Sequence, residues 1–331
     1  MILHKDMRLL VQAIVMAACF LFGGLTAPAA WAQAWPAKTI TVVVPLGGGS
    51  GTDVLARVVM EQVSKQLGRA VIVENRPGAG GTIGANSVAR SAPDGYTLLA
   101  WGAMGVAHAL YSKIPYDTFH DFIPIVPLGQ QPLVAVTSPA KGYKTLAALV
   151  AAAKAEPGQL NYSSAGIGSV SHFAAERLLA STGTKVQNIP FKGAAEAVTD
   201  VVAGRADFSI EPITAALSLI GDGQLVALAV STKSRAALLP DVPTMVEAGM
   251  PADSIYPFWS GLFAPAGTPP EVVAALHKAV SDAVRVPAVH EQLRKIGVEP
   301  LPMSQQQFVA FFKDDVDMNV ALQKAANIPR Q

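Results

Sequence analysis

Short apolar runs rich in β-branched residues alternate with helical patterns along most of this chain. In the first third, residues 39–45, 70–74 and 96–100 have the composition of strands, and residues 53–67 and 82–92 have helical patterns between them. A strand, a helix and a second strand form the repeating unit of a parallel sheet. The sequence therefore predicts an α/β fold.

The alternation resumes in a second block and then gives way to helices. In the second block the predicted strands are 122–128, 133–137, 160–163, 185–190, 206–210 and 225–231, and the predicted helices are 145–156, 169–181, 194–203 and 212–220. A return segment at 258–264 precedes three further helices at 270–284, 287–296 and 304–325. This order predicts two α/β domains crossed twice by the chain, with the ligand site between them. Their expected boundaries are 33–131 with 258–331 for domain 1, and 132–257 for domain 2.

Two glycine-rich turns, at residues 45–53 and 75–84, each lead from a predicted strand into a helix. Glycine lets the backbone approach a ligand closely, and a helix N-terminus carries about half a positive charge. Two such turns at the carboxyl ends of neighbouring strands suit a small anion.

Several familiar site types are missing from the sequence. Neither turn has the Gly-Lys-Ser/Thr ending of a phosphate-binding loop or the G-x-G-x-x-G spacing of a dinucleotide site, so no cofactor is expected. No G-x-S-x-G elbow surrounds Ser50 or Ser169, and no two histidines have metal-ligand spacing. Ser164 or Ser169 as nucleophile, with His172 as base, is the only catalytic pair that the sequence suggests. A secreted hydrolase is therefore a weak alternative.

Three further residues have both a structural and a functional interpretation. His172 ends a third glycine- and serine-rich turn, 163–172. Either Ser169 or Ser171 caps the next helix and His172 packs locally, or the same hydroxyls and amides bind an anion. Lys192, in a fourth turn at 190–194, either pairs with a carboxylate or remains solvated. Asp53 either shapes the first turn and contacts the ligand, or simply complements the dipole of the following helix.

Residues 1–32 have the pattern of a secretory signal peptide. Lys5 and Arg8 precede an apolar stretch from Leu9 to Leu25, and an Ala-x-Ala site ends at Ala32. Cleavage after Ala32 is expected; retention as a membrane anchor is the alternative, and a lipid attached at Cys19 fits less well. The expected location is a bacterial periplasm.

The mature chain is neutral and free of cysteine. Removal of residues 1–32 takes away Lys5, Arg8 and Asp6, so that the 25 basic and 24 acidic side chains become 23 and 23. Neutrality argues against binding to nucleic acid or to a membrane surface. Cys19 is the only cysteine, which excludes disulfides and thiolate chemistry in the mature protein.

Eight segments in order, spread over the whole mature chain, resemble the Bug family, the extracytoplasmic solute receptors of tripartite tricarboxylate transporters. They are Trp35-Pro36, Val44-Pro45 with Gly51-Thr52-Asp53, 73–81, 92–98, 164–172, Pro190-Phe191-Lys192-Gly193, Asp241-Val242-Pro243-Thr244 and 264–269. The resemblance implies a two-lobed, type II periplasmic-binding-protein-like fold with two Rossmann-like domains. It also implies a monomer that closes on a small mono- or dicarboxylate, performs no chemistry and delivers the solute to membrane subunits. A receptor that presents its ligand to a signalling system is the alternative use of this fold.

The resemblance also implies which residues bind the solute. In the second lobe they are Ser164, Gly168, Ser169, Lys192, Gly193 and Ala194; in the first lobe, acting partly through water, they are Gly47, Gly49, Ser50, Thr52, Asp53, Gly80, Gly81, Thr82 and Ala103. The sequence departs from the family pattern at Leu46, Gly47, Ser50, Ser163, Ala194 and Glu211-Pro212. Glu211 stands where aspartate is expected, and it either favours an amino-bearing solute or points away from the site.

Overall fold

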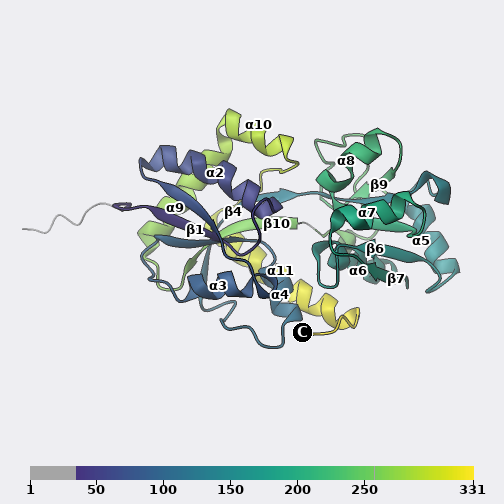
Figure 1. The fold of residues 1–331 in the computed structure, drawn as a ribbon, viewed down its shortest axis with the longest axis horizontal. Coiled ribbons are helices and arrows are strands. Elements are labelled where there is room, and N and C mark those ends of the chain that lie inside the picture. Colours follow the sequence, from purple (N-terminus) through teal and green to yellow (C-terminus); the bar gives the residue numbers. More distant parts are fainter. Residues whose placement is uncertain (1–34, 257) are drawn as a thin grey trace, which may run out of the picture. The chain divides into compact units, whose positions relative to one another are not determined.

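The computed structural model describes residues 35–256 and 258–331 of the chain (Figure 1). The predicted signal peptide lies outside these residues. The described part contains two five-stranded sheets, each associated with its own helices. This is the mixed α/β architecture expected of a two-lobed binding protein.

The first sheet has the strand order β2-β1-β3-β10-β4. Its strands are β1 (Ile40–Val44), β2 (Val71–Asn75), β3 (Thr97–Trp101), β4 (Phe122–Gln131) and β10 (Phe258–Pro265). The accompanying helices are α2 (Gly51–Leu67), α3 (Thr82–Ala89), α4 (Met104–Leu110), α9 (Pro270–Arg285), α10 (Pro287–Lys295) and α11 (Gln305–Ala325). Strand β1 pairs in parallel with β2 and β3, so that the glycine-rich turns after β1 and β2 leave the same edge of the sheet.

The second sheet has the strand order β7-β6-β8-β5-β9. Its strands are β5 (Leu133–Thr137), β6 (Asn161–Ser164), β7 (Gln187–Pro190), β8 (Phe208–Pro212) and β9 (Val226–Val230). Its helices are α5 (Leu146–Ala155), α6 (Val170–Thr182), α7 (Ala194–Val202) and α8 (Ile213–Gly221). Strand β6 runs parallel to β7 and β8, so that the turns after β6 and β7 are neighbours.

The alternation is typical of a parallel sheet, and two strands depart from that arrangement. Strand β10 runs antiparallel to β3 and β4, and β5 runs antiparallel to β8 and β9. The apolar alternation identifies a strand but carries no information about its direction. Two consecutive strands can pair in parallel only when a long crossover connection joins them. Only Pro132 separates β4 from β5, and β5 joins the other sheet.

Helix boundaries follow local capping chemistry. The Ser50 side chain caps α2, and Gly68 ends it in the left-handed conformation. Ser304 and Gln307 form a reciprocal capping box at the start of α11. Helix α3 ends at Ala89, three residues before its predicted end, and α4 was not predicted because no side-chain cap marks its start.

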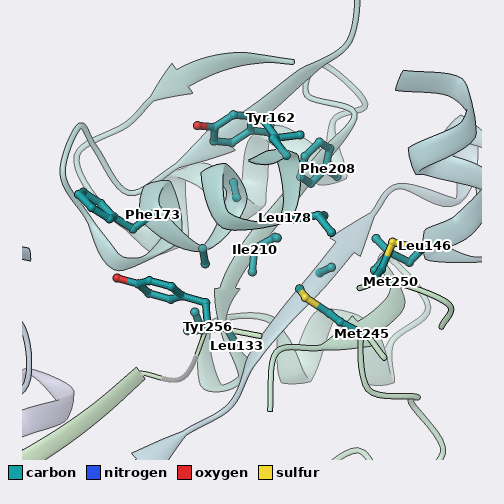
Figure 2. Close-up of a cluster of buried hydrophobic side chains, with 14 of the residues drawn as sticks. Leu133, Leu146, Tyr162, Phe173, Leu178, Phe208, Ile210, Met245, Met250 and Tyr256 are labelled. Atoms are coloured by element: carbon teal, nitrogen blue, oxygen red, sulfur yellow. The ribbon is translucent and has the colours of Figure 1, made fainter. Parts of the chain in front are cut away.

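One buried cluster joins the second sheet to helices that follow strands of the first. Tyr162, Phe173 and Phe208 lie in it together with Leu110 of α4 and Leu322 of α11. Figure 2 shows Phe173 of α6, Tyr162 of β6, Phe208 of β8 and Tyr256 around this core. The third and fourth turns are therefore supported by close-packed side chains.

Replacing Phe208 by alanine tests this core. Phe208 is 1% exposed, so Phe208→Ala is expected to lower the free energy of unfolding by about 3–5 kcal/mol through lost burial and a residual cavity. Phe119→Ala is the matched control, because Phe119 is 41% exposed and its loss is expected to cost about 1 kcal/mol or less. Urea unfolding measures both, and equal losses for the two variants would contradict the assignment of the core.

Candidate functional site

Asp53 lies beneath the first glycine-rich turn and holds its shape. Its carboxylate accepts the Gly49 amide at 2.8 Å and the Asn75 side-chain amide at 2.9 Å, and it pairs with Arg57 at 3.0 Å. Asn75 also donates to the Leu46 carbonyl at 3.1 Å and so connects the ends of β1 and β2. Asn75 was missed as a site residue, although its place directly after a predicted strand was a signal.

The negative charge of Asp53 is stabilised by donors within its own turn and helix. Burial raises the pKa of Asp53, but the hydrogen bonds from Arg57, Gly49 and Asn75 outweigh this and hold the pKa below its ordinary value. The Thr52 hydroxyl also points inward, 3.0 Å from Ser260 Oγ. The exposed part of the turn therefore consists of glycine backbone, with Gly47 and Gly49 on the surface.

The second turn is packed against aromatic side chains. Gly80 and Gly81 have φ values of 62° and 101°, and a Cβ at either position would collide with Tyr111 or Trp101. Trp101 is fully buried, so it is a core residue. Thr82 donates its hydroxyl to the Ala79 carbonyl at 2.9 Å.

Ala103 directly precedes α4, a helix that contacts the second turn at residues 79–81. It is partly buried, and it lines a small cavity of about 10 Å³ with Val170, Tyr256 and Asp315. A volume of this size corresponds to about one water molecule. Ala103, which precedes the first-lobe helix α4, thus lies close to Val170, the first residue of α6.

Ser169 begins the third turn's helix and belongs to a chain of hydroxyl groups. Its Oγ accepts the His172 amide at 3.2 Å and lies 3.0 Å from Ser171 Oγ. Ser171 Oγ in turn accepts the Ala165 amide at 2.8 Å. The sequence offered Ser171 as an alternative to Ser169 for capping or anion binding, but its bond to the Ala165 amide was not predicted, because helical periodicity does not show which hydroxyl turns back into the loop.

His172 is a neutral, buried part of the same turn. Its Nδ1 accepts the Gly168 amide at 3.0 Å, which leaves the proton of the neutral ring on Nε2. Burial lowers the pKa of His172 to about 4. The Ser169 hydroxyl is bonded to the His172 backbone and not to its ring, so these residues do not form the nucleophile and base of a hydrolase.

The fourth turn lies directly beside the third. Ser164 pairs with Pro190 across β6 and β7, and the Phe191 amide donates to the Ser164 carbonyl at 2.8 Å. The Ser164 hydroxyl is fully buried and donates to Asn188 Oδ1 at 2.8 Å, so it supports the turn from below. Asn188 carried no signal in the sequence.

Unpaired backbone amides gather at these two turns. Within residues 35–256 and 258–331, no protein acceptor pairs with the amides of Gly166, Ile167, Val170, Gly193 and Ala194. They lie at or just before the N-termini of α6 and α7, where backbone N–H groups have no partner inside the helix. Lys192 is exposed, and its backbone amide donates to Glu196 at 3.3 Å.

Glu211 is the next-to-last residue of β8 and has no contact with solvent. It is 0% exposed, and its Oε1 accepts the Ser209 hydroxyl at 3.1 Å. Burial raises the pKa of Glu211 to about 8, against the opposing effect of the Ser171 and Ser209 hydroxyls. The Glu211 side chain therefore lies in the interior of the second lobe.

Most of the predicted site residues thus form two groups, one at the ends of β1 and β2 and one at the ends of β6 and β7. Ala103 lies outside the first group, after β3, and Glu211 lies outside the second, in β8. Gly168, with φ 80°, is packed against Leu110 of α4. Among the residues described, no three histidine, cysteine or acidic side chains are arranged to hold a metal ion, and no helix has the length and apolar character needed to cross a membrane.

Comparison with known proteins identifies relatives along the whole described chain. Residues 55–328 match the model of the tripartite tricarboxylate transporter family receptor. Protein BugT of Bordetella pertussis is 37% identical over 88% of this chain and 90% of its own. Rpa4515 of Rhodopseudomonas palustris, solved with adipate, has 30% identity and a TM-score of 0.76, covering 90% of this chain and 100% of its own. MatC of the same organism, solved with bound malate, has 32% identity and a TM-score of 0.71 over 87% and 99%.

The role of Asp53 gives a pH-dependent prediction. Asp53→Asn is expected to lower the free energy of unfolding at pH 7 by about 1.5–3 kcal/mol, because it weakens bonds to an ionised carboxylate. Since the folded-state pKa is lowered, this stabilisation exists above the unfolded pKa and disappears as the pH falls through the folded value. The difference between wild type and variant should therefore shrink below about pH 4.

Glu61→Gln, on the exposed side of the same helix, is the matched carboxylate-to-amide control for thermal unfolding. The role of Asp53 would be contradicted if its replacement were as harmless at pH 7 as that of Glu61.

Proposed function

Because this chain belongs to the tripartite tricarboxylate transporter receptor family, we propose that the solute it captures is a small mono- or dicarboxylate. Members of this family are periplasmic solute-binding receptors, so the protein binds its solute and does not transform it. Relatives with the same fold hold adipate and malate. A small carboxylate solute agrees with the formal neutrality of the mature chain, which has no excess of basic residues.

The observation that carries this proposal is the pair of adjacent helix N-termini in the second sheet. Five backbone amides without a protein partner lie at or just before the starts of α6 and α7, next to the Ser169 hydroxyl. Both helix dipoles favour a negative charge at this point. We assign one carboxylate of the solute to the free amides of Gly193 and Ala194 and to the Ser169 hydroxyl. Gly168, whose amide donates to His172, shapes the turn beside them, and Ser164 and His172 support the turns from below.

The first-lobe turns are assigned to the other end of the solute. Gly47 and Gly49 are exposed, and Ser50 caps α2 with its side chain. Gly80, Gly81 and Thr82 form the neighbouring turn, and Ala103 begins α4. Amides at such turns bind anions directly or through ordered water, which lets one scaffold accept solutes of different length.

The same proposal includes two domains with defined boundaries. Domain 1 comprises residues 33–131 and 258–331, and domain 2 comprises residues 132–257. Supporting this division, β4 ends at Gln131 in one sheet and β5 begins at Leu133 in the other, and β10 returns to the first sheet at Phe258.

The transport role is the final part of the proposal. Family members serve transporters, and for this chain we propose delivery of the solute to membrane subunits by a monomer. Residues 1–32 would direct export to the periplasm and would be removed by cleavage after Ala32. No observation favours a signalling role over delivery to a transporter.

Binding measurements on the mature chain test the proposal. Calorimetric titration with adipate, malate and a panel of other small mono- and dicarboxylates is expected to show saturable binding, and any retained ligand is identified by mass spectrometry after denaturation. Gly193→Val should weaken binding at least about tenfold, which corresponds to about 1.4 kcal/mol, because the side chain would cover free amides. Gly193 has extended backbone and open space around its Cβ position, so the variant should fold.

Gly221→Val is the matched control, because Gly221 has equally open surroundings at the end of α8, away from the four turns. The carboxylate assignment is wrong if wild type binds none of the panel. The place of the site is wrong if Gly193→Val and Gly221→Val bind equally well.

A further inference from the structure

A groove of about 780 Å³ lies over β4, the last strand of the first sheet, and takes no residue from the four glycine-rich turns. Its other sides are the C-terminal half of α9, His290 of α10 and the segment 300–304 before α11. A volume of this size falls within the range of pockets that enclose drug-sized ligands. The groove is therefore a candidate for a second ligand site.

The segment 300–304 is kept off β4 by its own sequence. Antiparallel pairing with β4 begins at Glu299, whose amide donates to the Gln130 carbonyl at 2.8 Å and whose carbonyl accepts the Gln130 amide at 2.9 Å. Pro300 and Pro302 follow, and neither has an N–H group with which to extend the pairing. The segment thus leaves the strand and becomes one wall of the groove.

Two side chains fix the far end of this wall. The Gln305 side-chain amide donates to the Pro124 carbonyl at 3.0 Å, which returns the chain to β4. His277 of α9 lies 3.0 Å from the Met303 carbonyl through Nε2, and since a carbonyl only accepts, Nε2 donates. The groove is therefore held open by contacts of the protein itself, as is usual for ligand pockets.

The deeper part of the groove is apolar. Val126 and Leu128 of β4 lie at its floor and are 3% and 1% exposed. Val284, Leu301 and Met303 line its sides and are partly buried. An aliphatic or aromatic group placed here is removed from water, which favours binding through the hydrophobic effect. A solute with polar groups along its whole length gains little from such a surface.

The rim of the groove carries positive charge that has no direct partner. Lys278 pairs with Asp282, the one acidic side chain among the described residues that line the groove. Arg285 and His290 are exposed, and within residues 35–256 and 258–331 their side chains form no ion pair. Arg285 stabilises the charge of Asp282 only from a distance. Its guanidinium is always charged and can donate two parallel hydrogen bonds to one carboxylate or sulfonate.

We propose that this groove binds a small amphipathic organic anion. Its aliphatic or aromatic body lies between α9 and the segment 300–304, and its negative head group lies at Arg285. The apolar floor and the unpaired cation at the rim complement these two parts. The site is independent of the solute function proposed above, because it shares no residue with the glycine-rich turns.

The first test is titration calorimetry of the mature chain with naphthoate and decanoate, an aromatic and an aliphatic probe of this class. Both are expected to show saturable binding. Naphthylmethanol has the same rings as naphthoate but no charge, and it should bind at least about tenfold more weakly, because it loses the charged hydrogen bonds at the rim.

Two substitutions in the groove locate the binding site. Arg285→Gln should weaken naphthoate binding about fivefold, as expected for loss of an exposed ion pair. Arg69→Gln is the matched control, because Arg69 is also exposed but lies just after α2, outside the groove. Ser281→Phe should weaken binding at least about tenfold, because Ser281 lines the groove and the larger ring would fill it.

Both probes are carboxylates, so the test must separate the groove from the proposed solute turns. Gly193→Val should leave naphthoate binding unchanged, and an excess of adipate should not displace the probe. Loss of naphthoate binding in Gly193→Val together with wild-type binding in Arg285→Gln would place the probe at the solute turns and overturn the proposal.

The remaining outcomes are equally decisive. The proposal is wrong if wild type binds neither probe, if naphthylmethanol binds as tightly as naphthoate, or if Arg285→Gln and Arg69→Gln bind alike. A dimer in sedimentation velocity that Ser281→Phe disrupts would show that a second copy of the chain covers the groove, which also overturns it. Failure to bind adipate, malate and the other small carboxylates of the panel contradicts the proposed solute function and leaves the groove unaffected.

Discussion

The turns that we propose as the solute site are held in shape by side chains beneath them. Asp53 and Asn75 fix the turn after β1, while Ser171 and His172 fix the turn after β6 by accepting backbone amides. The amides that remain unpaired are therefore held in place by the fold itself, which limits the entropy cost of ordering the loops on binding.

The two buried acids near these turns have opposite electrostatic states for identifiable reasons. Arg57 and two amide donors compensate Asp53, so that its charge is stabilised within the turn. Glu211 has only hydroxyl neighbours, and burial determines its state. As a result, the second-lobe turns offer backbone dipoles and hydroxyls without a buried fixed charge. Such an arrangement suits reversible capture, because a full ion pair would add a desolvation cost and slow release.

The sequence predicted the positions of helices and strands better than it predicted the directions of the strands or which side chains point inward. The turns at 45–53 and 163–172 lie where expected, because glycine and serine at a strand end have few other structural roles. The antiparallel placement of β10 could not be predicted, since it depends on which sheet the returning chain joins. Ser164 and Glu211 stand at strand ends buried on both faces, so alternation gave no sign of whether they point inward or outward.

The return crossing between the two sheets is tied to a single helix. Tyr256 donates its hydroxyl to Asn319 at 2.8 Å, and the Trp259 indole donates to Asp315 at 3.0 Å. Burial raises the pKa of Asp315 to about 7, while its bonds to Trp259 and Asn319 oppose that rise. Because both flanks of the crossing are bonded to α11, a change in the relation between the sheets must either move this helix with them or break a buried hydrogen bond. Leu322 of the same helix lies in the core with Phe173 of α6, so α11 connects the crossing to the helix that carries Ser169.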